Sequence, residues 1–598
     1  MPKMPSITIK IKHDRNVHQV SVDPSQPATA FKAAIHQKTG VPPERQKVMV
    51  KGGLLKDDTD LSKLNLKEGQ MLMVIGTAGE LPKGPLGPIN FLEDMTDSQL
   101  ASATKQKVGL VNLGNTCYLN STLQVLRVIP ELQVALNSFA GNMGGADGER
   151  NLTASLRDLY KSLNETTEAF PPLAFLSILR SVAPQFAEQQ QQGGGFAQQD
   201  AEEAWVRIIQ ALQSSLSGLA ATGDASAAQE AQSRRFIEQY MTGSMLVKRS
   251  CPEAPQEEPT YTSDSFKVLQ CNISSSTNDM SSGIKDSLTQ QLEKTSETLG
   301  RTAVYDEQRS IDRLPAYLTT HFVRFYWRRE IGKKTKIMRK VRFPFELDVT
   351  DFLSEGLKEK TLKYREKVHE VGKEREERAK VRRKAKARRE EATKSDAAAS
   401  TQPDELGNVT SAGAEAPKPA DAMAVDTTEE KVKTDDSTAF ATASGASTAV
   451  AGSSSAAIGA AGAVVSPEEE LVLREKESAE LDACLHPDLK ADVGCNPSAL
   501  YELVGIVTHK GANADGGHYI SWVVKEDDSG ADPAAAAIEG ADGGKGKAAK
   551  LVDQPFGEEW YKFDDEKVSV VGRDKITMLD GGGEDSTAYL LLYRAKRL

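Results

Sequence analysis

GNTCYLNS, residues Gly114–Ser121, places a thiol, Cys117, at the start of a predicted helix. The spacing of apolar residues predicts that this helix runs from Tyr118 to Val128, just before Pro130. The aligned peptide dipoles and free N–H groups at a helix N-terminus favour a thiolate, which is the nucleophilic form of cysteine. We therefore interpret Cys117 as a candidate nucleophile, against the alternative of a small buried hydrophobic residue.

A second stretch, GGHYISW at Gly516–Trp522, offers an imidazole directly after a pair of glycines. Its alternating pattern predicts a strand that carries His518. A thiol needs a nearby base to become a thiolate, so His518 is the candidate general base and acid. His509 and His321 do not follow such a glycine turn, and we interpret both as structural.

A third stretch, WYKFDD at Trp560–Asp565, offers a carboxylate that could orient the imidazole. We choose Asp564 for this role and keep Asp565 as the second candidate. An insertion rich in Ala, Gly and Asp, residues 527–550, separates this stretch from His518.

In this order, the stretches resemble the cysteine and histidine boxes of the ubiquitin-specific proteases. FAQQDAEE at Phe196–Glu203 resembles the glutamine-aspartate box of that family, and YELVGIV at Tyr501–Val507 resembles the strand that enters its histidine box. The resemblance implies an α+β fold, a papain-like cysteine protease with thumb, palm and fingers. It also implies hydrolysis of isopeptide bonds at the ubiquitin C-terminus through an acyl-enzyme on Cys117.

The resemblance implies further site residues. Asn112 matches the family position that supplies an oxyanion-hole donor, and the backbone N–H of Cys117 would supply another. Gln199 and Asp200 match positions that contact the C-terminal tail of ubiquitin, although Asp200 also suits a helix N-cap. Asn115 is interpreted as a turn residue.

Residues 1–76 predict a compact β-grasp domain, with strands at Ile7–Lys12, Val17–Val22, Gln46–Gly53 and Gln70–Ile75 around a short helix. This segment resembles ubiquitin, and the chain continues past it without a terminal Gly-Gly. A ubiquitin-like domain ahead of this catalytic domain implies the proteasome-associated branch of the family. The implied partner is the regulatory particle of the 26S proteasome, contacted by the face expected to carry Met49, Val74 and Lys12.

The remaining chain is divided by composition. Residues 77–106, rich in proline and glycine, predict a linker, and residues 107–598 predict the catalytic domain. Within it, 358–394 is dense in Lys, Arg and Glu and predicts an exposed charged helix. Residues 395–466, rich in Ala, Ser, Thr and Gly, predict a disordered insertion, as do residues 527–550.

Composition narrows the function classes. Residues 1–76 hold 12 lysines and arginines against 7 acidic residues, a net of +5 that leaves −16 for the remainder. An acidic enzyme body suits the cationic tail of ubiquitin and argues against nucleic acid as the main partner. No apolar run is long enough to span a membrane, and no secretory signal precedes the β-grasp segment.

The five cysteines are too few and too scattered for a disulfide framework or a zinc site. We expect no cofactor and no metal, a chain that is monomeric when free, and a reducing location in the cytoplasm and nucleus. Two alternatives remain open: a catalytically weak or silent ubiquitin-binding regulatory subunit of the proteasome, and an unrelated peptidase.

Overall fold

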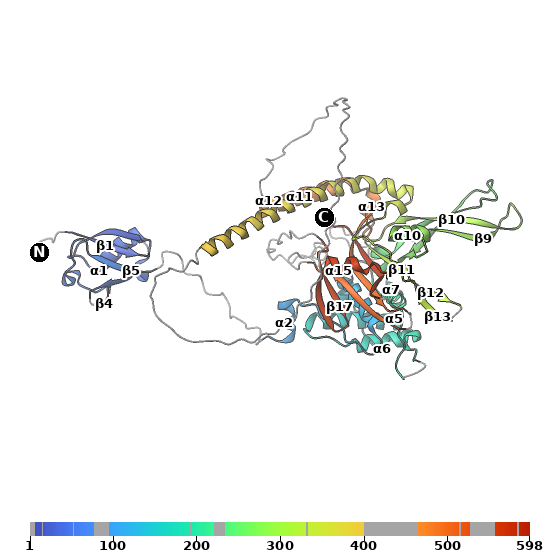
Figure 1. The fold of residues 1–598 in the computed structure, drawn as a ribbon, viewed down its shortest axis with the longest axis horizontal. Helices are drawn as coiled ribbons and strands as arrows, with labels where there is room; N and C mark the ends of the chain where they lie inside the picture. Colours follow the sequence, from blue (N-terminus) through green and yellow to red (C-terminus); the bar gives the residue numbers. More distant parts are fainter. Residues whose placement is uncertain are drawn as a thin grey trace, which may run out of the picture. The chain divides into compact units, whose positions relative to one another are not determined.

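The computed structural model describes residues 6–14, 16–51, 53–76, 95–190, 194–219, 234–329, 333–399, 465–512, 516–526, 556–582 and 585–597. The chain forms two compact units, Met1–Met95 and Thr96–Leu598. Each unit is described by itself, and Figure 1 shows the elements of both.

The N-terminal unit is a β-grasp domain. Its five-stranded sheet has the order β2-β1-β5-β3-β4, in which β1 and β5 are parallel, and helix α1 packs on one face. This agrees with the strands and the helix predicted from the apolar pattern. The elements are β1 (Ile7–His13), β2 (Asn16–Val22), α1 (Ala28–Thr39), β3 (Lys47–Val50), β4 (Gly53–Leu54) and β5 (Met71–Ile75).

The register of this sheet corrects one expectation. Val74 pairs with Val48 and is only 2% exposed, so it packs in the core and cannot belong to a recognition surface. Met49 pairs with Met73, and both side chains are exposed. Because successive side chains of a strand point to opposite faces, Met73 occupies the outer position that we expected for Val74. Lys12, which is exposed, lies on β1 and pairs with Met73 of β5.

The predicted linker is shorter than expected. Residues 77–94 lie outside the described residues, but Asp97–Thr104 forms helix α2, which packs against helix α5 (Gly148–Glu165) of the second unit. The helix begins at a capping box in which Thr96 and Gln99 satisfy each other's backbone N–H groups. The second unit therefore starts at Thr96, within the segment predicted to be linker.

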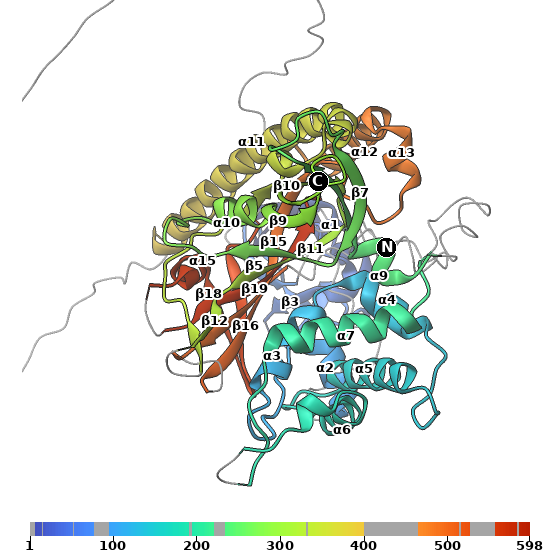
Figure 2. The same ribbon diagram turned by 90° about the vertical axis from the view of Figure 1, so that its right-hand side faces the viewer.

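A helical layer surrounds helix α3 (Cys117–Leu126), which begins with Cys117. Every residue of α3 is buried, including polar ones, because the other helices of the layer and the main sheet enclose it. Figure 2 shows α3, α5, α6 and α7 gathered on the same side of the unit. The helices are α3 (Cys117–Leu126), α4 (Pro130–Ser138), α5 (Gly148–Glu165), α6 (Leu173–Val182), α7 (Ala201–Ser215) and α9 (Phe236–Tyr240).

The main sheet of this unit packs against α3. Its strand order is β18-β17-β16-β15-β19-β11-β8, with β14 also paired to β15. The strands are β8 (Val268–Asn272), β11 (Tyr317–Val323), β14 (Glu346–Asp348), β15 (Leu500–Lys510), β16 (His518–Val524), β17 (Glu559–Asp564), β18 (Lys567–Gly572) and β19 (Thr587–Ala595). Helix α15 (Arg573–Thr577) follows β18.

A second sheet, in the order β7-β6-β10-β9, extends from the unit in Figure 1 and matches the expected fingers. Its strands are β6 (Gly243–Ser250), β7 (Thr260–Phe266), β9 (Thr289–Thr295) and β10 (Thr302–Arg313), with helix α10 (Met280–Ser287) leading into β9. A small cluster of Cys251, Ala254, Ala303 and Tyr305 packs within it. Strands β12 (Phe325–Arg328) and β13 (Lys333–Lys336) form a separate hairpin.

The charged segment 358–394 lies within one long helix, α11 (Glu355–Ala399). The first half of this helix is partly buried rather than fully exposed. Val368 and Val371 are buried, and α12 (Pro467–Cys484) lies beside the helix. Ion pairs join the two helices, including Arg375 with Glu477 at 2.6 Å. Helix α13 (Pro487–Ala491) follows α12.

Two predicted insertions fall mainly on residues that are not described. Of segment 395–466, residues 400–464 lie outside the described residues, while 395–399 end helix α11 and Ser466 caps α12. All of segment 527–550 lies outside them. Within the described residues, no helix is long and apolar enough to cross a bilayer.

Candidate active site

A tight loop places Cys117 at the first position of α3. Gly114 and Asn115 both have positive φ, at 91° and 54°, which turns the chain sharply into the helix. The side-chain oxygen of Asn112 accepts hydrogen bonds from the backbone N–H groups of Gly114 at 3.0 Å and Thr116 at 3.2 Å. Asn115 Nδ2 donates to the carbonyl of Phe196, so the interpreted turn residue also ties the loop to the chain before α7.

The thiol of Cys117 lies among hydrogen-bond donors. Its side chain is 3% exposed, and Sγ accepts from the backbone N–H of Tyr519 at 3.4 Å. The Nε2 group of Gln198 also donates to Sγ, at 3.8 Å. Donors of this kind stabilise a thiolate, as does the N-terminal end of a helix. The site is therefore built for an anionic sulfur.

His518 lies between the thiol and a carboxylate. Its Nε2 is 2.7 Å from Oδ1 of Asp564, which leaves the other ring nitrogen for Cys117. The hydrogen bond with Cys117 raises the pKa of His518 to about 9; burial opposes this rise, and the hydrogen bond with Asp564 supports it. Burial would raise the pKa of Asp564, but hydrogen bonds from His518 and Lys562 outweigh it and hold the pKa below its usual value.

Gly517 has to be a glycine for steric reasons. Its φ is 138°, and a Cβ there would lie 2.3 Å from the carbonyl oxygen of Lys510 and 2.6 Å from Nε2 of His509. A larger residue would push the start of β16 away from β15 and move His518 with it. Gly516 meets no such obstruction.

Asp565 has a different role from the one considered in the sequence. Its Oδ2 accepts from Nδ2 of Asn112 at 2.8 Å, and its Oδ1 accepts from Nδ2 of Asn120 at the same distance. With Oδ1 of Asn112 already bonded to the loop, this contact fixes which end of the amide is the donor. The second hydrogen of Asn112 Nδ2 and the N–H of Cys117 are the donors that we expect to serve an oxyanion.

The ring nitrogens of the two other histidines considered in the sequence are buried. Burial lowers the pKa of His321 to about 4, and burial with the nearby Lys336 lowers that of His509 to about 3. Both rings make edge contacts with aromatic side chains, His321 with Tyr589 and His509 with Phe325. The structure therefore places them in the packing of the sheet.

The glutamine-aspartate box supplies the helix N-cap that the sequence suggested for Asp200. Asp200 caps α7 by accepting from the N–H of Glu202 at 2.7 Å, and it also accepts from the hydroxyl of Tyr589. Gln199 is partly exposed. The residue that reaches the thiol is Gln198, which the sequence analysis did not single out; adjacent glutamines give no sequence signal that tells which one points inward.

These groups define a class of enzyme: a thiol hydrolase with a Cys-His-Asp arrangement. In this arrangement His518 can accept the proton of Cys117 and the thiolate can attack a carbonyl carbon, and we expect Asn112 with the Cys117 N–H to hold the resulting oxyanion. His518 then protonates the leaving amine, and water releases the acyl group. Among the described residues, no group of three or more His, Cys, Asp or Glu side chains is placed to hold a metal ion.

Comparison with known proteins agrees with this geometry. The family model described as ubiquitin carboxyl-terminal hydrolase matches residues 108–593, and the ubiquitin family model matches residues 7–79. The chain is 34% identical to ubiquitin carboxyl-terminal hydrolase 6 of Schizosaccharomyces pombe, over 99% of both chains. It is also 34% identical to ubiquitin carboxyl-terminal hydrolase 6 of Arabidopsis thaliana, over 99% of both. For ubiquitin carboxyl-terminal hydrolase 14 of Caenorhabditis elegans, the identity is 27% over 99% of this chain and 94% of the relative.

The chain belongs to the ubiquitin carboxyl-terminal hydrolase family, as the resemblance implied, and carries an N-terminal domain of the ubiquitin family. It is a thiol-dependent deubiquitinase with an α+β catalytic domain.

The pKa of His518 provides a direct test of the site. In Cys117→Ala it should fall from about 9 toward the ordinary value of about 6.5, because the contact with Cys117 is the largest cause of the rise. NMR titration of the histidine ring protons, with His518→Gln for assignment, would measure it. The rings of His509 and His321 should stay neutral above about pH 5 in both proteins.

The raised pKa of His518 also makes the stability of the folded protein depend on pH. Because the folded-state pKa of His518 exceeds the unfolded value, its charge contributes stability that is complete below about pH 6.5. That contribution is lost as the pH rises through about 9. A wild-type His518 that titrates near pH 6.5 would contradict the pairing with Cys117.

Proposed function

We propose that this deubiquitinase acts on ubiquitin conjugates held at the 26S proteasome and docks on the regulatory particle through its ubiquitin-like domain. The observation that carries the proposal is the presence, on one chain, of an assembled thiol site and a β-grasp domain with an exposed apolar surface. The names of the full-length relatives, ubiquitin carboxyl-terminal hydrolases, support the substrate.

The docking surface is the outer face of the β-grasp sheet. Its exposed side chains, here called the outer patch, are Met49, Leu54, Met71, Met73 and Ile75. An apolar patch of this kind on a small domain marks an interaction site. Exposed lysines, Lys10 and Lys12 on β1 and Lys47 on β3, pair with residues of the patch. The chemistry suits a partner surface that is apolar at its centre and acidic at its rim.

The catalytic unit is proposed to hold the C-terminal tail of ubiquitin beside the glutamine-aspartate box. Gln199 is partly exposed there, and Asp200, which caps α7, presents a carboxylate that suits a cationic tail. We place the enzyme in the cytoplasm and nucleus, where thiols stay reduced. All five cysteines are free thiols, which supports this location.

Met49→Asp should lower the affinity of the full-length enzyme for purified 26S proteasome at least tenfold, or about 1.4 kcal/mol. The reason is that Met49, 47% exposed, lies within the outer patch, and a carboxylate buried there against an apolar partner has no compensating charge. Co-sedimentation or co-purification with the proteasome measures the effect. Cleavage of a ubiquitin–fluorophore conjugate by the free enzyme should not change, because the substitution lies in the other unit.

Ala33→Asp is the matched control. It adds the same charge at an exposed position of helix α1, which packs on the other face of the sheet. This variant should bind the proteasome as the wild type does. Equal binding by Met49→Asp and wild type would move the contact away from the outer patch and onto the catalytic unit.

A further inference from the structure

The carboxylate of Asp564 is held at both of its oxygens. Its Oδ1 lies 2.7 Å from Nε2 of His518, and its Oδ2 accepts a hydrogen bond from Nζ of Lys562 at 3.0 Å. The terminal torsion of an aspartate is broad, so a carboxylate with a single partner can turn within its site. A donor on the second oxygen limits that turning and keeps Oδ1 directed at the imidazole.

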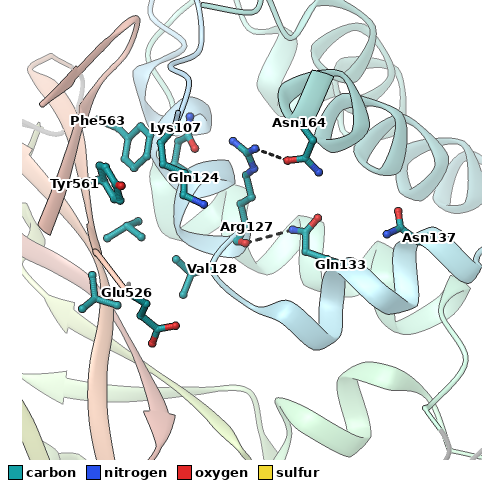
Figure 3. A pocket seen from close by; sticks show the side chains of 12 residues that line it. Lys107, Gln124, Arg127, Val128, Gln133, Asn137, Asn164, Glu526, Tyr561 and Phe563 are labelled. Carbon is teal, nitrogen blue, oxygen red and sulfur yellow. Dashed lines mark hydrogen bonds between the residues drawn. The ribbon is translucent and has the colours of Figure 1, made fainter. Parts of the chain in front are cut away.

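Strand β17 places Lys562 and Asp564 on the same side, because side chains two positions apart on a strand share a face. The alternate residues, Tyr561 and Phe563, point to the other face, where they line the pocket beside the C-terminal end of α3 that Figure 3 shows. Tyr561 and Phe563 thus pack β17 against the core. Lys562 and Asp564 remain together on the opposite side of the strand.

Lys562 is itself held in place from β16. Trp522 pairs with Lys562 across the ladder, and the Nζ atom of Lys562 lies over the indole ring, 5.7 Å from its centre. Trp522 is buried, and its Nε1 donates to the hydroxyl of Thr508 on β15 at 3.1 Å. A cation within about 6 Å of an aromatic ring is attracted to its face. The ammonium group is therefore fixed between two partners, a ring on β16 and the carboxylate on β17.

We propose that Lys562 is a positioning residue of this deubiquitinase, which keeps Asp564 aligned on His518 through the second oxygen of the carboxylate. Ion pairs near the surface often contribute little to stability. This one differs in its acceptor, because Asp564 is the carboxylate that orients the catalytic imidazole. Loss of Lys562 should therefore change turnover more than folding.

Removal of the ammonium group has two opposite effects on the pKa of His518. A nearby positive charge disfavours the imidazolium, so its loss alone would raise that pKa. Loss of alignment would weaken the hydrogen bond with Asp564, which supports the high pKa, and would therefore lower it. The direction of the change separates a positioning residue from a bystander charge. The other titratable groups around the ring stay the same in the variants below: Cys117 on α3, Asp564 and Asp565 at the end of β17, and His509 and Lys510 on β15.

Lys562→Met tests the proposal, because it keeps an unbranched side chain against Trp522 and loses the ammonium group. On a ubiquitin–fluorophore conjugate, kcat should fall about tenfold and KM should stay within about twofold, since a misaligned catalytic group slows the chemical step. In the NMR titration, the pKa of His518 should fall by at least about half a unit from about 9. The alkaline limb of kcat/KM should move to lower pH with it. Lys562→Arg, which keeps a charged donor, should restore kcat to within about threefold of wild type.

Lys525→Met is the matched control. Nζ of Lys525 lies 2.6 Å from a carboxylate oxygen of Glu559, which forms a second ion pair between the segments of β16 and β17. The side chain of Lys525 is 30% exposed, against 28% for Lys562. This variant should keep the kcat, the KM and the pKa of His518 of the wild type.

Four results would overturn the proposal: a pKa of His518 that rises or stays unchanged in Lys562→Met, a wild-type kcat in that variant, no rescue by Lys562→Arg, or an equal loss of kcat in Lys525→Met. Thermal melting shows whether Lys562→Met folds as the wild type does. If it melts well below the wild type, Lys562→Gln replaces it and is judged by the same four results.

Discussion

Cys117→Ala should abolish hydrolysis of a ubiquitin–fluorophore conjugate while ubiquitin binding survives. Loss of a catalytic nucleophile costs on the order of 10⁶-fold in kcat in a comparable hydrolase. The substitution removes one sulfur atom from a side chain that is 3% exposed, so it changes little of the surface that ubiquitin contacts. The rate of fluorophore release measures the loss of hydrolysis, and calorimetry with ubiquitin measures the affinity separately. Activity within about tenfold of wild type, or about 1.4 kcal/mol of barrier, would remove Cys117 as the nucleophile.

Cys484→Ala is the control for this experiment. Cys484 is a free, partly exposed cysteine on α12, outside the site, so its replacement should leave turnover unchanged. The wild type should also react with a ubiquitin C-terminal activity probe, which requires a competent thiolate. A wild-type enzyme that binds ubiquitin but does not react with the probe would instead favour the silent regulatory subunit.

Asp565→Ala should lower kcat by about 10² to 10³, the loss typical of one oxyanion-hole donor, with little change in KM. The carboxylate of Asp565 does not contact His518 through any hydrogen bond seen here; it holds Nδ2 of Asn112 at 2.8 Å. Without it, the amide of Asn112 is held only through its Oδ1, so its Nδ2 is directed less firmly at the oxyanion. Asp565 is thus a positioning residue, and steady-state kinetics on the ubiquitin conjugate measures its contribution.

A double-mutant cycle separates this role from a general loss of structure. If Asp565 acts through Asn112, the double variant Asn112→Ala, Asp565→Ala should lose little more activity than either single variant. Glu566→Ala, at the next and exposed position, should behave as wild type. Fully additive losses, or an equal loss in Glu566→Ala, would show that Asp565 does not act through Asn112.

The sequence by itself determined the elements whose signals are local. The apolar spacing after Cys117 predicted a helix, and the structure has one over Cys117–Leu126. The alternation in residues 7–75 predicted the strands of the β-grasp domain. These elements can be predicted from the sequence because the periods of helices and strands are set by the backbone and depend little on distant parts of the chain.

Other features were decided only by tertiary structure. Asp564 and Asp565 are neighbours of the same type, and only their directions at the end of β17 send one to His518 and the other to Asn112, 453 residues away in sequence. Strand pairing likewise buried Val74 and exposed Met73, although both are apolar residues of one strand.

The surroundings of the long helix α11 were also decided only by tertiary structure. Its sequence, dense in charge, predicted full exposure, but α12 supplies acidic partners from about a hundred residues further along the chain, such as Glu477 for Arg375. Whether a charged side chain faces solvent or an opposite charge depends on which segment packs beside it. Local sequence fixes the period of an element, whereas its neighbours are chosen by long-range packing, and the roles of adjacent residues such as Asp564 and Asp565 follow from those neighbours.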